Sequence, residues 1–161
     1  MSIPINIQNT LINFPSSGQS PNWSQAVIDF AKAVELALAS VVGPYDTPPQ
    51  VYSMVSNVNN NVNLPNLNFP TTAVRSAFIR YAVYRTTSTD VAYEAGSITV
   101  VYNPTNPVGN KWEITKDFIG DGKIEFIMSD TGQMEFTTVA LPGINHTGKV
   151  TYTAQAVLQS A

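Results

Sequence analysis

His146 is the first residue of this sequence to consider for proton-transfer chemistry, because the 161 residues contain no other histidine. It lies in the segment from Pro142 to Gly148, which its proline and glycines mark as a loop between two strands. A catalytic histidine needs a nucleophile to activate, and the chain has neither a cysteine nor the Gly-x-Ser-x-Gly elbow of a serine hydrolase. We therefore predict no catalytic residue, and we treat Asn145 and His146 only as candidate ligand-binding residues.

Acidic side chains between Asp117 and Asp130 raise the question of a metal site. A calcium-binding EF-hand places oxygen ligands at alternate positions before its glycine and closes with a glutamate. The segment from Phe118 to Glu125, FIGDGKIE, lacks that series, and turn formation explains Asp121-Gly122 more simply. We predict neither a metal nor any other cofactor.

Three glutamates could supply the carboxylate pair of a glycoside hydrolase only if folding brought two of them together in space. These are Glu113, Glu125 and Glu135, and they fall opposite the apolar Trp112, Phe126 and Phe136 on their expected strands. Such alternation is typical of a sheet with one solvated face. We therefore predict that the protein is not an enzyme.

Arg80 lies within the most apolar strand-like stretch of the sequence, Ala73 to Thr87. Both sides of this stretch are apolar under the two-residue period of a β-strand, which predicts a central strand buried on two faces. A charged residue in such a place needs a partner. We predict that Arg80 pairs with an acidic residue such as Glu94, or that it lies at a contact between subunits.

From Ala73 onward, alternating segments separated by turn residues predict an antiparallel series of about six strands. The strongest hairpin signal in this series is Asp121-Gly122. The expected fold is mainly β: an antiparallel, jelly-roll-like β-sandwich that occupies residues 44–161, preceded by one long helix and an extended arm.

Residues 1–19 alternate weakly and predict an extended N-terminal arm, which either pairs with the edge of its own sheet or reaches a neighbouring subunit. Residues 20–43 predict one long helix, with Pro21 in its first turn and Gly43-Pro44 as its stop signal. This helix has an apolar face at heptad spacing, which packs either on the protein's own sheet or against other copies of the chain. The residues of that face are Trp23, Val27, Phe30, Val34 and Val41.

Charged residues make up only 12% of the sequence, about half the usual share for a globular domain. A surface made of Asn, Thr, Ser and Gln favours a protein that is covered by other protein, so we expect a homo-oligomer. The net charge of −3 comes from scattered residues and offers no basic stripe for a nucleic-acid backbone. The sequence has no signal-peptide pattern and no apolar run of membrane length, so we expect neither nucleic acid nor membrane as a partner.

The second half of the chain resembles a recurrent β domain of tailed-bacteriophage virion proteins. The residues that carry the resemblance follow one another as Ala73 to Thr87, Glu94 to Asn103, Trp112, Gly120-Asp121-Gly122, Ile124 to Phe126, Gly132 to Thr138 and Gly148 to Tyr152. A looser likeness covers the helix, which begins with Ser20 to Trp23 and ends with Gly43 to Asp46.

This resemblance implies a non-enzymatic virion structural protein, an accessory subunit displayed on the particle as a capsid decoration or fibre-type protein. It would act by self-association and particle stabilisation, as a homo-oligomer with a trimer favoured, in contact with major capsid, neck or tail proteins. It would be made in the host cytoplasm and reside in the virion. The alternative is a host glycan-binding or receptor-binding module of a tail or fibre assembly, using Asn57 to Asn68 and Pro142 to Gly148.

Overall fold

The computed structural model describes residues 3–7, 10–14, 27–34 and 43–159. The chain divides into two compact units, Met1–Pro44 and Tyr45–Ala161. Each unit is described by itself below. No helix in the described ranges is long and apolar enough to cross a membrane.

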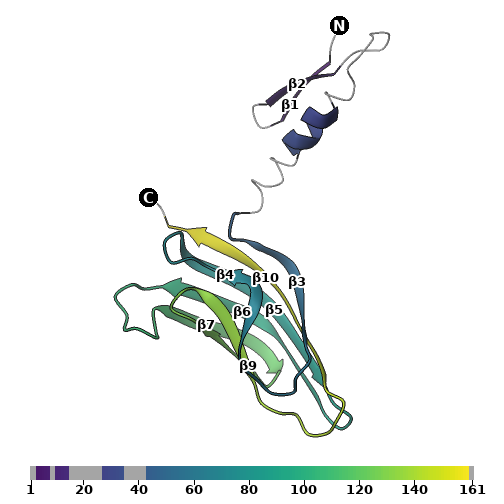
Figure 1. Cartoon of the computed structure of the whole chain (residues 1–161), viewed down its shortest axis with the longest axis vertical. Helices are drawn as coiled ribbons and strands as arrows, with labels where there is room; N and C mark the ends of the chain where they lie inside the picture. Colours follow the sequence, from purple (N-terminus) through teal and green to yellow (C-terminus); the bar gives the residue numbers. More distant parts are fainter. Residues whose placement is uncertain (1–2, 8–9, 15–26, 35–42, 160–161) are drawn as a thin grey trace. The chain divides into compact units, whose positions relative to one another are not determined.

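The first unit contains two strands, β1 (Ile3–Ile7) and β2 (Thr10–Phe14), which pair antiparallel (Figure 1). Ile3 lies opposite Phe14 and Ile5 opposite Ile12. The described part of the predicted arm is therefore not a single extended segment, because the arm folds back and pairs with itself. Only two residues separate the strands, which is the length of the commonest hairpin loops.

The only helix in the described part of the first unit covers residues 27–34. The long helix predicted for residues 20–43 is thus supported over this segment alone, and Trp23 and Val41 of its apolar face lie outside the described residues. Val27 and Phe30 are exposed, Val34 is half-buried, and the buried side chain of the segment is Ala33.

The second unit is an eight-stranded antiparallel sandwich (Figure 1). One sheet has the order β3-β10-β5-β6-β7 and the other β4-β9-β8. The strands are β3 (Thr47–Met54), β4 (Asn59–Asn68), β5 (Val74–Thr86), β6 (Val91–Tyr102), β7 (Trp112–Asp121), β8 (Ile124–Met128), β9 (Gln133–Thr138) and β10 (Thr147–Leu158). The predicted mainly β, antiparallel class is confirmed.

The hydrophobic core lies between the two sheets and draws side chains from both. Aromatic contacts join the layers: Tyr81 of β5 meets Phe126 of β8 with ring centroids 4.7 Å apart, and Tyr52 of β3 meets Phe136 of β9 at 5.7 Å. Edge-on contacts of this kind stabilise a core beyond the area that they bury. The other large buried side chains include Leu64, Leu67, Phe69, Ile79, Ile98, Val100, Met134 and Val150.

Strand β5 is the middle strand of its sheet, with β10 and β6 on its two sides. It is not buried on two faces, however. Ile79, Tyr81 and Val83 point into the core, whereas Phe78 and Tyr84 are 37% and 53% exposed on the other side. The prediction of two buried faces is wrong because a two-layer sandwich covers each sheet on one face only.

The turn at Asp121–Lys123 does not form the hairpin that Asp121-Gly122 predicts. The preceding strand β7 belongs to the five-stranded sheet, and the following strand β8 belongs to the three-stranded sheet. The turn is therefore a corner at which the chain crosses from one layer of the sandwich to the other.

Candidate functional site

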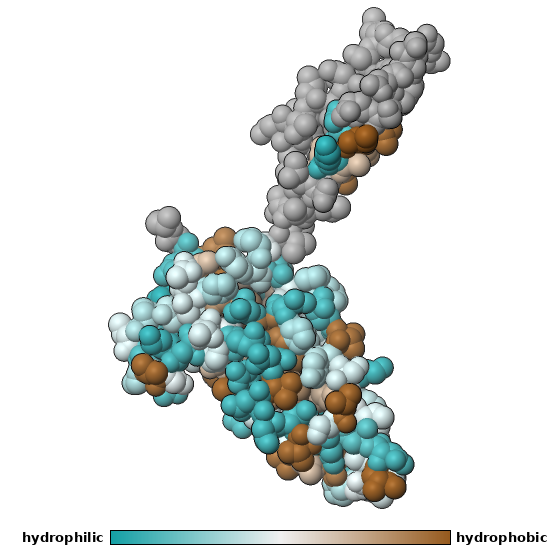
Figure 2. Space-filling model, in the orientation of Figure 1, coloured by the Kyte–Doolittle hydropathy of each residue, from teal (hydrophilic) through white to brown (hydrophobic). Residues whose placement is uncertain are grey.

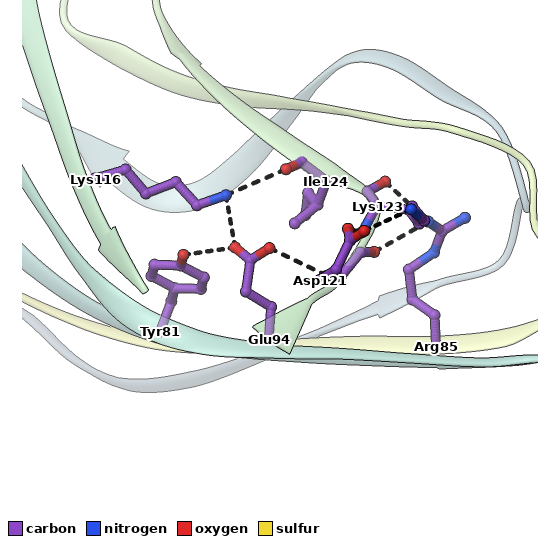
Figure 3. A network of polar contacts seen from close by, with 8 residues as sticks. Tyr81, Arg85, Glu94, Lys116, Asp121, Lys123 and Ile124 are labelled. Carbon is purple, nitrogen blue, oxygen red and sulfur yellow. Dashed lines mark hydrogen bonds and ion pairs between the residues drawn. The ribbon is translucent and has the colours of Figure 1, made fainter. Parts of the chain in front are cut away.

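Glu94 of β6 is a carboxylate buried between the two sheets, with only 3% of its surface exposed. It accepts a hydrogen bond from the hydroxyl of Tyr81 at 2.6 Å (Figure 3). It accepts another from the backbone N–H of Gly122 at 3.1 Å. The ammonium group of Lys116 lies 2.6 Å from Oε1 and forms an ion pair. A carboxylate that is shielded from water and engaged by three donors is held in place as a structural group.

Arg85 of β5 is also buried, with no exposed surface. Its guanidinium donates hydrogen bonds to the carbonyl oxygens of Gly122, Lys123 and Val139 at 3.2, 2.9 and 2.9 Å. It also donates to the carbonyl oxygen of Asn57 at 2.6 Å and to the side-chain oxygen of that residue at 3.1 Å. Arg85 therefore ties together three segments that are far apart in the sequence.

The peptide group of Gly122 connects these two buried charges. Its N–H donates to Glu94, and its carbonyl oxygen accepts from Arg85. Burial, and then the hydrogen bond to Glu94, raise the pKa of Tyr81 well above its ordinary value, so its hydroxyl remains a donor to Glu94 even in alkaline solution.

We call Tyr81, Glu94, Lys116, Arg85 and the Gly122 peptide the buried polar network. One of its buried polar atoms, the Nε of Arg85, has no hydrogen-bond partner in the described structure. The other contacts of the network are internal to the sandwich and reach both of its sheets. The arrangement positions the corner between the sheets.

His146 is partly buried, and both of its ring nitrogens lie out of solvent with no hydrogen-bond partner in the described structure. Burial, and then the positive charge of Arg85, lower the pKa of this imidazole. The residue before it, Asn145, is exposed and has a left-handed backbone with a φ of 58°. The sequence-predicted pair thus lies on one loop, but the two residues differ in their surroundings.

A cavity of about 540 Å³ adjoins His146 at the ends of β3, β5 and β10. Its lining includes the residues Tyr84, Lys149 and Ser53, but no carboxylate. A cavity with these groups can hold a small polar molecule against an aromatic ring. Its titratable side chains are His146, Tyr84 and Lys149.

Arg80 lies on the exposed side of β5, opposite Ser97 of β6. Its guanidinium carbon is 5.7 Å from the centre of the Phe78 ring. The expected pairing with Glu94 is wrong, because the two-residue period of the strands places Arg80 on the outer face of the sheet and Glu94 on the inner face. A contact of Arg80 with another subunit stays a prediction.

Sequence reasoning missed Arg85, Glu94 and Lys116 as the polar centre of the core. The signal was present for Arg85, since it continues the inward-facing alternation of Ile79, Tyr81 and Val83.

Within the described ranges, no group of three or more histidine, aspartate and glutamate side chains is placed to hold a metal ion.

The sequence matches no protein-family model and no curated protein. Among solved structures, the chain is similar to the tailspike protein of Acinetobacter phage vB_ApiP_P1, with a TM-score of 0.38 and 10% sequence identity. That similarity covers 66% of this chain and 22% of the tailspike chain, so it spans about a fifth of the larger protein.

Proposed function

We propose that this chain is a non-enzymatic structural subunit of a bacteriophage virion, displayed on the particle as a decoration or fibre-type protein. It acts by associating with copies of itself and with neighbouring virion proteins, and so stabilises the particle. The assignment to a phage particle rests on the sequence resemblance of the second half of the chain, which the antiparallel sandwich fits.

The observation that most supports a role in assembly is the distribution of apolar side chains. Large apolar residues stay exposed in both units of the chain: Val27 on the helix is 53% exposed, and Tyr93 and Ile119 on the sandwich are 64% and 85% exposed. Figure 2 shows such residues scattered among polar ones on one face of the sandwich. The buried polar network, by contrast, is engaged in contacts internal to the sandwich.

The test is the solution mass of the full chain at micromolar concentration, combined with mass spectrometry of purified particles. We expect an oligomer, with a trimer as the state that the resemblance favours, and we expect the chain among the proteins of the intact particle. A stable monomer that is also missing from the particle would overturn the proposal.

Val34→Asp tests what the helix contributes. Val34 is half-buried on the helix of residues 27–34. If the helix joins subunits, the variant dissociates into folded subunits; if the helix packs within its own chain, the variant loses stability without a change in association. Circular dichroism and sedimentation measured on the same samples separate the two results.

A second candidate function, recognition of a host glycan or receptor, is favoured by the cavity beside His146. An exposed tyrosine ring with nearby donors suits the stacking and hydrogen bonding by which proteins hold small polar ligands. Glycan-array binding that is lost on replacement of Asn145 and His146 would support this reading. Binding that survives the replacement, or no binding at all, would count against it.

A further inference from the structure

The outer face of the five-stranded sheet is a broad surface of the sandwich whose apolar residues are left in solvent. We define it by the outward residues of all five strands, which lie in cross-strand register with one another. Its exposed apolar members include Phe78 and Tyr84 on β5, Tyr93 and Val101 on β6, and Val157 on β10.

Positive and negative side chains on this face lie on different strands. In one row across the sheet, Thr153 of β10 is followed by Arg80 of β5, Ser97 of β6 and Asp117 of β7. The row therefore carries its cation on the middle strand and its carboxylate on the edge strand. No ion pair involves Arg80 or Asp117 among the described residues.

A second row repeats this polarity. Lys149 of β10 is followed by Tyr84, Tyr93 and then Asp121 of β7, which also forms an ion pair with Lys123. The outer face thus has a basic side along β10 and β5 and an acidic side along β7. A surface with that pattern is complementary to itself when the order of its strands is reversed.

The shape of the face is also complementary to itself, because a hollow lies at one end of a row and a projecting side chain lies at the other. Between the two charged rows lies a row that runs from Val51 of β3 through Thr151, Ala82 and Ala95 to Ile119 of β7. At one end of the row, a hollow of about 370 Å³ is lined by Val51, Ala82 and Thr151 among others, with mostly apolar walls. At the other end, Ile119 projects from the edge strand with 85% of its surface exposed.

We propose that this outer face binds the same face of a second copy of the chain, about a two-fold axis parallel to the strands and passing between β5 and β6. Such an axis keeps every row at its own height and lays β7 of one copy over β10 of the other. Ile119 then enters the partner's hollow, Asp121 lies over Lys149, and Asp117 lies one strand away from Arg80.

The symmetry makes every one of these contacts occur twice. The axis overlays four strands, β10, β5, β6 and β7. With strands about 4.8 Å apart and ten residues about 3.3 Å apart, they give a face of roughly 630 Å², at the lower end of the area that each partner buries in a specific interface. Aligned packing of two sheets face to face, about 10 Å apart, is also an ordinary arrangement of β-structure. A second copy therefore fits this face in charge, shape and size.

This inference rests on the proposed self-association and names the surface that performs it. The first experiment compares the solution mass of three full-length proteins: the natural sequence, Ile119→Asp and Val108→Asp. Val108 is the matched control, because it is also 85% exposed but lies outside the strands, in the loop between β6 and β7.

We expect the natural protein to contain an even number of copies, because each contact joins two chains. A trimer, the state that the resemblance favours, would leave one such face without a partner and would overturn this inference while leaving self-association intact.

Ile119→Asp should raise the dissociation constant by about tenfold or more, because it puts a carboxylate in place of the apolar side chain that fills the partner's hollow, and Val108→Asp should leave it unchanged. Circular dichroism should show that all three proteins are folded, since both positions are on the surface. An Ile119→Asp protein that associates like the natural one would overturn the proposal.

The second experiment uses charge reversal and tests the symmetry itself. Arg80→Asp brings a new carboxylate close to the partner's Asp117, and Asp117→Arg brings a new cation close to the partner's Arg80. Each variant alone should therefore dissociate. In an equimolar mixture of the two variants, the introduced carboxylate of one chain meets the introduced guanidinium of the other. The natural Asp117 and Arg80 that remain also meet, so the mixture should regain the mass of the natural protein.

These experiments distinguish a failure of the two-fold contact from a failure of self-association. Restored association in the mixture supports the two-fold contact. If the natural protein is an oligomer but the mixture stays dissociated, or the single variants stay associated, the outer face is not the contact and self-association must use another surface. If the natural protein itself is a monomer, both this inference and the proposed self-association fail.

Discussion

Arg85 is the residue on which the core of the sandwich most depends. It is fully buried, and its five hydrogen bonds reach the backbone or side chain of four residues in three separate segments. A guanidinium suits this position because its planar fork carries several donors in fixed directions, whereas a lysine could reach only some of the acceptors.

We predict that Arg85→Met lowers the free energy of unfolding by about 3 kcal/mol or more, because each buried carbonyl oxygen left without a donor costs roughly 1–3 kcal/mol. Arg75→Met is the control: Arg75 lies on the same strand but is exposed, so its replacement should have little effect. Urea unfolding of both variants measures the difference. Equal stabilities would mean that Arg85 is not a structural anchor.

His146 should make the stability of the folded chain fall as the pH falls below 6.5. Burial and then Arg85 lower its pKa from the ordinary value of 6.5 in the folded chain, so the unfolded chain binds a proton first as the pH falls. The stability that neutral His146 contributes is therefore complete above pH 6.5 and is lost as the pH falls from 6.5 toward the folded pKa.

His146→Gln should flatten this slope of the unfolding free energy between about pH 5 and pH 7. The pKa values of Asp121 and Asp130 are lowered from 3.8, by hydrogen bonds from Lys123 and from the backbone of Gly109 respectively. Their contributions are lost only at more acid pH and do not overlap the window. A variant with an unchanged slope would show that another group is responsible.

At the scale of the element, the edge strand β7 depends on a close approach to β6. Gly96 lies opposite Phe118 in the register of the two strands. A Cβ atom at Gly96 would lie 2.2 Å from the carbonyl oxygen of Asp117 and 2.8 Å from the Cα of Phe118. Both contacts are with backbone, which cannot rotate out of the way.

We predict that Gly96→Ala destabilises the protein by about 2 kcal/mol, within the usual cost of overpacking, and that the loss is concentrated at β7. Hydrogen exchange should show faster exchange of the β7 amides than of the β5 amides. Ser97→Ala, one residue further along, is the control and should be nearly neutral. Equal protection of β7 in both variants would contradict the prediction.

Strands are the elements that the sequence predicts best, because period-two alternation reports a half-buried strand directly. The six strands from β5 to β10 follow the expected order. What alternation does not supply is the sheet to which each strand belongs. Asp121-Gly122 is a local turn signal, whereas the separation of β7 from β8 depends on partners far away in the sequence.

The candidate site is harder to predict than the fold for a related reason. Arg80 and Arg85 look alike in the sequence of one strand, yet one is exposed and the other fully buried. Because β5 has apolar residues on both sides, its sequence does not indicate which face lies against the core. Only the contacts that the partners of Arg85 make across the sandwich decide it, and no local pattern encodes them.

At the scale of the whole molecule, the sandwich has its own core. All members of the hydrophobic core cluster lie between Met54 and Ala154, inside the unit Tyr45–Ala161. The buried polar network also lies wholly within that unit. Both features are what an independently folding domain requires.

We predict that a fragment of residues 45–161 folds cooperatively, with a melting temperature within about 5 °C of the value for the sandwich in the full chain. Near-ultraviolet circular dichroism should show fixed aromatic packing, since Tyr52, Tyr81, Phe126 and Phe136 contact one another in pairs across the core. A fragment that stays unfolded in native buffer would show that the first unit completes the core.

The Gly122 peptide connects the two sheets of the sandwich through its hydrogen bonds to Glu94 and Arg85. Through Arg85, this peptide is linked to the carbonyls of Asn57 and Val139, which flank β4 and β9 of the smaller sheet, and through Glu94 it is linked to β6 of the larger one. Neither sheet can therefore separate from the other without breaking the hydrogen bonds of the Gly122 peptide with Glu94 or Arg85. Under a pulling force, the domain should therefore unfold in a single event.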